Sequence, residues 1–124
     1  MKLRIKDNSI RIRLNQTEVT ELSGGAVLRS KTVFSPVSQF QYSLVPWELD
    51  VFNAHIEGDE LTVNMPIEKI QRWLESDETG FEFAQKNGET VPLTIIVEKD
   101  FACLNPRDNE ADNFPNPEEG KMIC

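Results

Sequence analysis

The sequence predicts an α+β protein in which a ββαββ unit occurs twice, giving eight antiparallel strands and two helices. Two observations predict this class. Apolar and polar residues alternate on both sides of several turn dipeptides, which is typical of β-hairpins. Each half of the chain also holds one short segment whose apolar residues have helical spacing, so the elements recur in the same order. We expect one domain over residues 1–100, with halves at about 1–49 and 50–100.

The first half begins with a predicted hairpin, because apolar residues alternate with basic ones on both sides of the turn at Asp7-Asn8. Asn15 and Glu18 have the spacing of a capping box, which predicts the start of a helix. Gly24-Gly25 ends that helix. The predicted elements are strands over 2–6, 10–14, 26–34 and 39–45 and a helix over 15–22.

The second half repeats these signals. Gly58-Asp59 separates two alternating runs and predicts a second hairpin. Pro66 suits the first position of a helix, and Ile67, Ile70 and Trp73 form an apolar stripe along it. The predicted elements are strands over 51–57, 60–65, 81–86 and 92–99 and a helix that begins at 66.

A shift of 51 positions superimposes the two halves. Apolar residues then coincide at six positions, which favours a structural duplication over a chance likeness of two hairpin–helix segments. The coinciding pairs are Ile5 and Ile56, Ile10 and Leu61, Ile12 and Val63, Leu14 and Met65, Val19 and Ile70, and Leu22 and Trp73.

The first thirteen residues carry five of the thirteen basic side chains of a chain whose net charge is −8. By strand alternation these bases lie opposite the apolar face of the sheet. Two similar halves favour a sheet closed, or nearly closed, into a barrel with the helices outside and this polar face in a lumen; the alternative is an open sheet with solvated charges. Other residues expected on this polar face are Arg29, Lys31, Gln39, Gln41, Thr62, Asn64, Glu82 and Glu98.

Over residues 1–99 the order of elements and the duplication resemble the CYTH, or triphosphate tunnel, superfamily. The resemblance implies an eight-stranded antiparallel tunnel whose charged lining holds a polyphosphate and a divalent metal. The E-x-E-x-K signature of that superfamily stands here as KLRIK at 2–6, without an acid, so no metal ligand is carried over. Separately, the segments MKLRIKDNSIRIRL, VEKDFACL and FPNP resemble a small uncharacterised bacterial family with no assigned activity.

The candidate site is the basic face. Arginine forks on adjacent strands suit phosphate or carboxylate, and nearby acids would otherwise neutralise them in internal ion pairs. The sequence favours non-catalytic binding of a small anionic ligand. The candidate ligand-binding residues are Arg4, Lys6, Arg11, Arg13 and Arg29, with Glu82 and Glu98 as counter-charges.

Two other functions stay open. A divergent metal-dependent triphosphate hydrolase of the tunnel type would need Glu82 and Glu98 to converge with Mg²⁺. An interaction protein would act through Trp47 and the acidic, Pro/Asn-rich tail over 101–124. The spacing of acids in 108–119 is disfavoured as a calcium loop, because Asn113 replaces the glycine needed at position 6.

Composition disfavours several further classes. The net charge of −8 argues against nucleic acid as the main partner. No apolar run is long enough to span a membrane and no signal peptide is evident, so we expect a cytoplasmic protein without a membrane partner. His55, the only histidine, is expected to be structural, and no motif predicts catalysis, a metal or a cofactor. The sequence leaves catalysis undecided but leans toward a protein that is not an enzyme.

Overall fold

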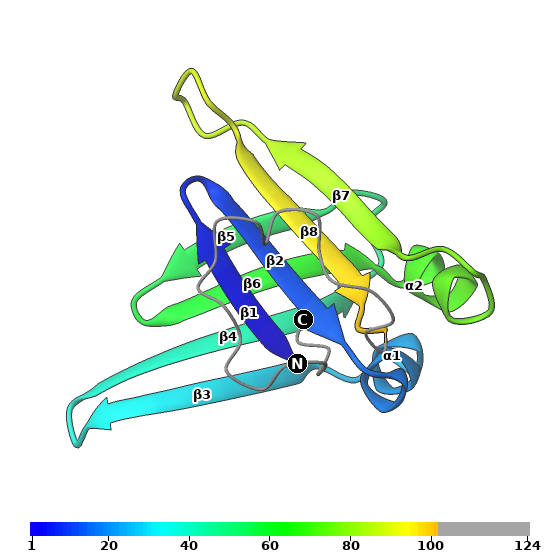
Figure 1. Cartoon of the computed structure of the whole chain (residues 1–124), viewed down its shortest axis with the longest axis horizontal. Coiled ribbons are helices and arrows are strands. Elements are labelled where there is room, and N and C mark those ends of the chain that lie inside the picture. The colour runs from blue at the N-terminus through cyan, green and yellow to red at the C-terminus, as the bar shows by residue number, and fades with distance from the viewer. Residues whose placement is uncertain (102–124) are drawn as a thin grey trace, which may run out of the picture.

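The computed structural model describes residues 1–101 and contains two four-stranded sheets, one in front of the other in Figure 1. Residues 102–124, the whole of the expected acidic tail except Phe101, lie outside the described residues. Sheet I has the order β1 (Lys2–Lys6), β2 (Ser9–Leu14), β8 (Leu93–Lys99) and β7 (Gly80–Gln85). Sheet II has the order β3 (Leu28–Ser35), β4 (Ser38–Trp47), β6 (Glu60–Pro66) and β5 (Asn53–Glu57).

The predicted single antiparallel barrel of the CYTH type is therefore wrong. Both sheets are mixed, because β2 runs parallel to β8 and β4 runs parallel to β6. Neither sheet closes on itself, and each ends in two edge strands. The lengths of the helices supply a physical reason. Two helices of eight residues are each only about 12 Å long, too short to cover the apolar faces of eight strands, so these faces cover each other.

The core consists of the inner faces of the two sheets together with one side of each helix. Ile12, Val63 and Val97 are fully buried there. Because alternate side chains of a strand point to opposite faces, the polar residues lie on the two outer faces. The polar lumen expected from the sequence is thus replaced by an apolar core between the sheets.

The two halves of the chain have corresponding positions in the two sheets. In sheet I the order is β1-β2-β8-β7, and the corresponding strands of sheet II are β5-β6-β4-β3. Each strand of sheet II thus stands four places later in the chain than its counterpart, when the count returns to β1 after β8. The registers correspond as well: Ile5 pairs with Ile10 across the first hairpin, and Ile56 pairs with Leu61 across the third. These pairs differ by 51 positions, so an approximate twofold axis passes between the sheets.

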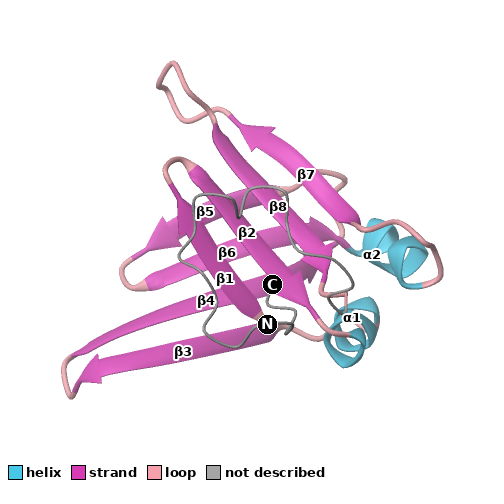
Figure 2. Cartoon of the chain, viewed as in Figure 1, coloured by secondary structure: helices cyan, strands magenta, loops and turns pink. Residues whose placement is uncertain are grey.

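The helices α1 (Gln16–Ser23) and α2 (Ile67–Leu74) pack against each other at one end of the sandwich, as Figure 2 shows. The capping box of α1 is confirmed: Asn15 Oδ1 accepts the backbone N–H of Glu18 at 2.9 Å, and Glu18 Oε1 accepts the N–H of Asn15 at 2.9 Å. Ile70 and Trp73 of α2 are buried, as its apolar stripe predicts.

Hydrogen bonds tie the sheets together along both sides. The side chain of Gln85 on β7 accepts the N–H of Ala54 on β5 at 2.7 Å and donates to its carbonyl at 2.6 Å. On the opposite side, the hydroxyl of Tyr42 on β4 donates to the carbonyl of Met1, next to β1, at 3.1 Å. The edge backbones of β5 and β1 therefore gain partners without joining the sheets into a barrel.

Candidate functional site

The basic face is the part of the outer surface of sheet I formed by Lys2, Arg4 and Lys6 of β1 and Arg11 and Arg13 of β2. Strand pairing arranges it in rows. Lys2 pairs with Arg13, which pairs with Glu98 on β8. Arg4 pairs with Arg11 in the next row, and Lys6 lies opposite Ser9 in the third.

Glu98 neutralises part of the basic face. Its Oε1 accepts a hydrogen bond from Arg13 Nε at 2.8 Å and lies 3.4 Å from Arg11 Nη1. The side chains of Glu98 and Arg13 are 15% and 23% exposed, against 38% for Arg11. Arg13 is thus held by its acid, whereas Arg11 shares that acid at longer range and keeps more of its guanidinium in solvent.

Asp100 follows the end of β8, two residues after Glu98, and so lies next to the first row. Its Oδ2 accepts a hydrogen bond from Lys2 Nζ at 2.7 Å. This hydrogen bond, together with the charges of Lys2 and Arg13, lowers the pKa of the Asp100 carboxyl below its ordinary value. Asp100, the residue before the last described one, therefore lies at the edge of the basic face.

The second and third rows are less well neutralised. Within residues 1–101, no carboxylate lies within ion-pairing distance of Arg4 or Lys6. Arg4 is exposed and lies directly opposite Arg11. Two like charges in opposite positions of neighbouring strands repel each other. An anion between these two guanidinium groups would relieve that repulsion and accept hydrogen bonds from both.

The other candidate site residues lie apart from these rows. Arg29 is on β3 of sheet II, where its Nε donates to Ser43 Oγ at 3.2 Å and its Nη2 lies 3.8 Å from Glu60 Oε1. Glu82 is on the outer face of sheet I, on β7, with Ile96 between it and Arg11 in the row. The expectation of one shared polar face is wrong, because β3 to β6 form a second sheet. Its outer face carries Arg29, Lys31, Gln39, Gln41, Thr62 and Asn64.

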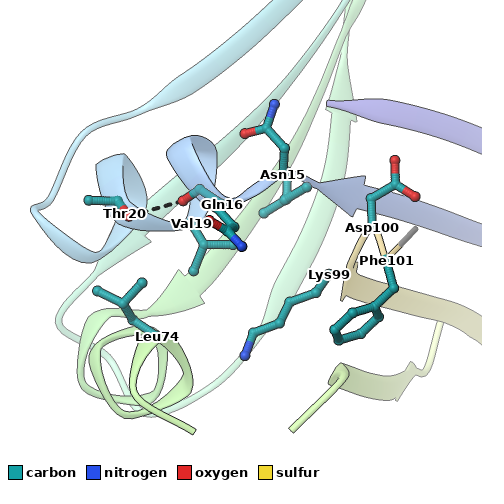
Figure 3. A pocket seen from close by; sticks show the side chains of 9 residues that line it. Asn15, Gln16, Val19, Thr20, Leu74, Lys99, Asp100 and Phe101 are labelled. Atoms are coloured by element: carbon teal, nitrogen blue, oxygen red, sulfur yellow. Dashed lines mark hydrogen bonds between the residues drawn. The ribbon is translucent and has the colours of Figure 1, made fainter. Parts of the chain in front are cut away.

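A cavity of about 350 Å³ lies at the helical end. Figure 3 shows Lys99 extending into it toward the helices, beside Phe101. The Lys99 ammonium donates to the carbonyl of Ser76 at 2.8 Å and lies 5.7 Å from the ring centroid of Trp73. The charge of Lys99 is thus used to fix the loop after α2. A smaller cavity of about 250 Å³ lies beside that loop, between Arg72 and Phe81.

The third cavity is an apolar cleft of about 290 Å³, formed where the two sheets separate opposite the helical end. Its lining follows the approximate twofold axis: Ile5 matches Ile56 and Ile10 matches Leu61 at the shift of 51. Phe40 matches Leu93 through the parallel pairings of β4 with β6 and of β8 with β2. Sequence reasoning missed this cleft because alternation places Ile5 on the apolar face of the sheet and does not fix which face Ile56 takes. They are 58% and 66% exposed. Their positions, two residues before the turns that begin at Asp7 and Gly58, were the available signal.

The described residues offer no metal centre: in the range 1–101, no group of three His, Cys, Asp or Glu side chains could hold an ion. His55 lies exposed on β5, with its Nδ1 3.3 Å from Asn53 Oδ1. Neither of the two helices in this part of the chain is long and apolar enough to cross a membrane.

The fold and its surface define an α+β protein of two mixed sheets, with a basic outer face on an acidic chain. The chain belongs to DUF7009, a family of unknown function that matches residues 1–118. This confirms that it comes from an uncharacterised family, as its sequence predicted. No curated protein and no solved structure matches the chain significantly.

Proposed function

We propose that the basic face binds a small anionic ligand, bearing phosphate or carboxylate groups, without chemical conversion. The observation that carries this proposal is the pairing of Arg4 with Arg11 at one register position, while Arg13 takes the shorter of the two contacts with Glu98. The ligand would occupy the position that a second acid would otherwise fill. Lys6 on the next row would extend the contact of an elongated ligand such as a polyphosphate.

The chemistry of these groups supports a phosphate or a carboxylate. A guanidinium presents its donors in a planar fork that matches two oxygens at once, and Lys6 adds a point charge. Arg4 and Lys6 are exposed, so binding through them is weakened by salt. A face with few enclosing walls favours modest affinity and a ligand of several negative charges.

The tunnel-type hydrolase would need a closed barrel with a polar lumen, and the two open sheets do not form one. The space between the sheets is apolar, and Glu82 and Glu98 stand on an outer face, one row apart on neighbouring strands. The interaction protein that would act through Trp47 and the acidic tail is a separate alternative. The indole N–H of Trp47 donates to the carbonyl of Val51 at 2.8 Å, and residues 102–124 lie outside the described residues.

We expect Arg4→Gln/Arg11→Gln to weaken the binding of tripolyphosphate by tenfold or more, because each substitution removes a charged donor worth about 1.5–3 kcal/mol. The measurement is isothermal titration calorimetry at low salt on the full chain. The matched control is Arg29→Gln/Lys31→Gln, which removes the same charge from the outer face of sheet II.

A control variant that loses as much affinity as Arg4→Gln/Arg11→Gln would show that net charge, and not the basic face, determines binding. No measurable binding of tripolyphosphate, inorganic phosphate or citrate, either to the wild-type chain or to a chain with the acids of its tail neutralised, would overturn the proposed function. Release of phosphate from tripolyphosphate with Mg²⁺ would overturn its non-catalytic part.

A further inference from the structure

We infer that the acidic tail, residues 102–124, binds the basic face of its own chain and competes there with free anions. The competition rests on the proposed function, whereas the docking of the tail stands on its own evidence. That evidence is complementary charge, the place where the chain leaves sheet I, and the length of chain available.

The charges of the two parts are complementary. The tail holds five acidic side chains against two basic ones, Arg107 and Lys121, and three of the acids stand at every second position. The bases of β1 and β2 also stand at every second position. The acids of an extended segment would therefore have the same spacing as the bases of the strand beneath it. The five acids are Asp108, Glu110, Asp112, Glu118 and Glu119.

The basic face needs more acid than sheet I supplies. Its five bases have Glu98, Asp100 and the more distant Glu82 as the acids of the same surface. The described part of the chain as a whole is acidic, which makes this excess of positive charge a local feature. Segments of opposite charge are attracted most strongly where such an excess is not already neutralised.

The tail also starts close to the basic face. Asp100, two residues before it, is already bonded to Lys2 in the first row of the basic face. From Lys2 to Lys6 is four residues of strand, or about 13 Å. The eight residues from Asp100 to Asp108 span up to about 27 Å when extended. Every base of the face is therefore within reach, and the tether gives the tail an effective concentration of about a millimolar or more.

The test neutralises the tail within the full chain. In the tail-neutral variant the five acids are replaced by their amides: Asp108→Asn, Glu110→Gln, Asp112→Asn, Glu118→Gln and Glu119→Gln. The control variant neutralises five exposed acids on other elements and loops: Glu21→Gln, Glu48→Gln, Glu57→Gln, Glu75→Gln and Glu89→Gln. Both variants change the net charge by the same amount, so a general effect of charge appears equally in the two.

Tripolyphosphate is the probe, titrated at low salt. We expect the tail-neutral variant to bind it about three- to tenfold more tightly than either the wild type or the control, because a competitor has been removed. We also expect this difference to disappear at high salt. Equal affinities of the tail-neutral and control variants would overturn the competition and leave the proposed function intact.

A second readout needs no anion. Cys103→Ser leaves Cys124 as the single thiol of the chain, to which a nitroxide label can be attached. We expect the label to broaden backbone amide NMR signals of β1 and β2 more than those of β5 and β6, and the tail-neutral substitutions to abolish this difference. Equal broadening of both sheets would overturn the docking of the tail. If neither the wild type nor the tail-neutral variant binds tripolyphosphate while this broadening is present, the proposed function fails and the docking stands.

Discussion

At the scale of single residues, strand alternation predicts correctly which side chains share a face within one hairpin. The five bases of β1 and β2 lie on one surface, as their spacing requires, and Glu98 lies beside Arg13. For Arg29, strand alternation predicted the wrong surface. Its own strand has a clear alternation, but alternation does not say to which sheet a strand belongs, and β3 joins the other one.

The titration of Asp100 tests the basic face at this scale. We expect Lys2→Gln to raise the pKa of the Asp100 carboxyl toward its ordinary value, because the hydrogen bond from Lys2 is the largest cause of its lowering. The measurement is an NMR titration of the carboxyl carbon. Lys31→Gln, a change on sheet II, is the control and should leave this pKa in place.

The sign of the effect on stability follows from the direction of the shift. A carboxyl whose pKa is lower in the folded state stabilises that state above its unfolded pKa, and this contribution is lost as the pH falls through the folded pKa. For an exposed pair such as Lys2–Asp100 it amounts to less than about 1 kcal/mol. An unchanged pKa in Lys2→Gln would contradict the described contact.

At the scale of elements, the order of strands and helices could be predicted, but the pairing of strands could not. Turn dipeptides and period-two alternation locate the strands of each hairpin, and the capping box locates α1. The parallel contact of β2 with β8 joins residues some 85 positions apart, such as Ile10 and Ile95, and has no local signal. The short helices were a usable signal against a barrel, since apolar strands need a cover of matching size.

Gly80 provides a test of the described register at the start of β7. A Cβ atom at this position would lie 2.1 Å from the carbonyl oxygen of Val97 and 2.6 Å from the Cα of Glu98. We expect Gly80→Ala to lower the free energy of unfolding by about 1–3 kcal/mol, because β7 or β8 must shift to admit the methyl group. Urea denaturation measures the change.

Gly24→Ala is the matched control for Gly80. The nearest atom to its added Cβ would be the carbonyl oxygen of Glu21 at 3.5 Å, an ordinary contact, and its φ of −83° suits any residue. We expect a change of less than about 0.5 kcal/mol there. A tolerant Gly80 would mean that β7 does not approach β8 as closely as described.

At the scale of the whole molecule, the two halves share their apolar positions and differ in their polar ones. Residues 51 positions apart are buried alike in the core, as Ile12 and Val63 are. On the outer faces the correspondence ends: Arg4 matches His55, and Arg11 matches Thr62. The common fold therefore needs the apolar positions alone, while the basic face is a property of one half, as expected of a surface that serves binding.

Paired truncations test this division of the molecule. Leu14 and Met65 match at the shift of 51 and are almost completely buried, so Leu14→Ala and Met65→Ala should each lower the free energy of unfolding by roughly 2–5 kcal/mol. Ile5 and Ile56 match in the same way but line the exposed cleft at the open end. Because solvent already reaches them, Ile5→Ala and Ile56→Ala should each cost less than about 1 kcal/mol. Urea denaturation of the four full-length variants gives these values. The approximate twofold relation would be contradicted if one member of a matched pair lost stability like a buried residue and the other like an exposed residue.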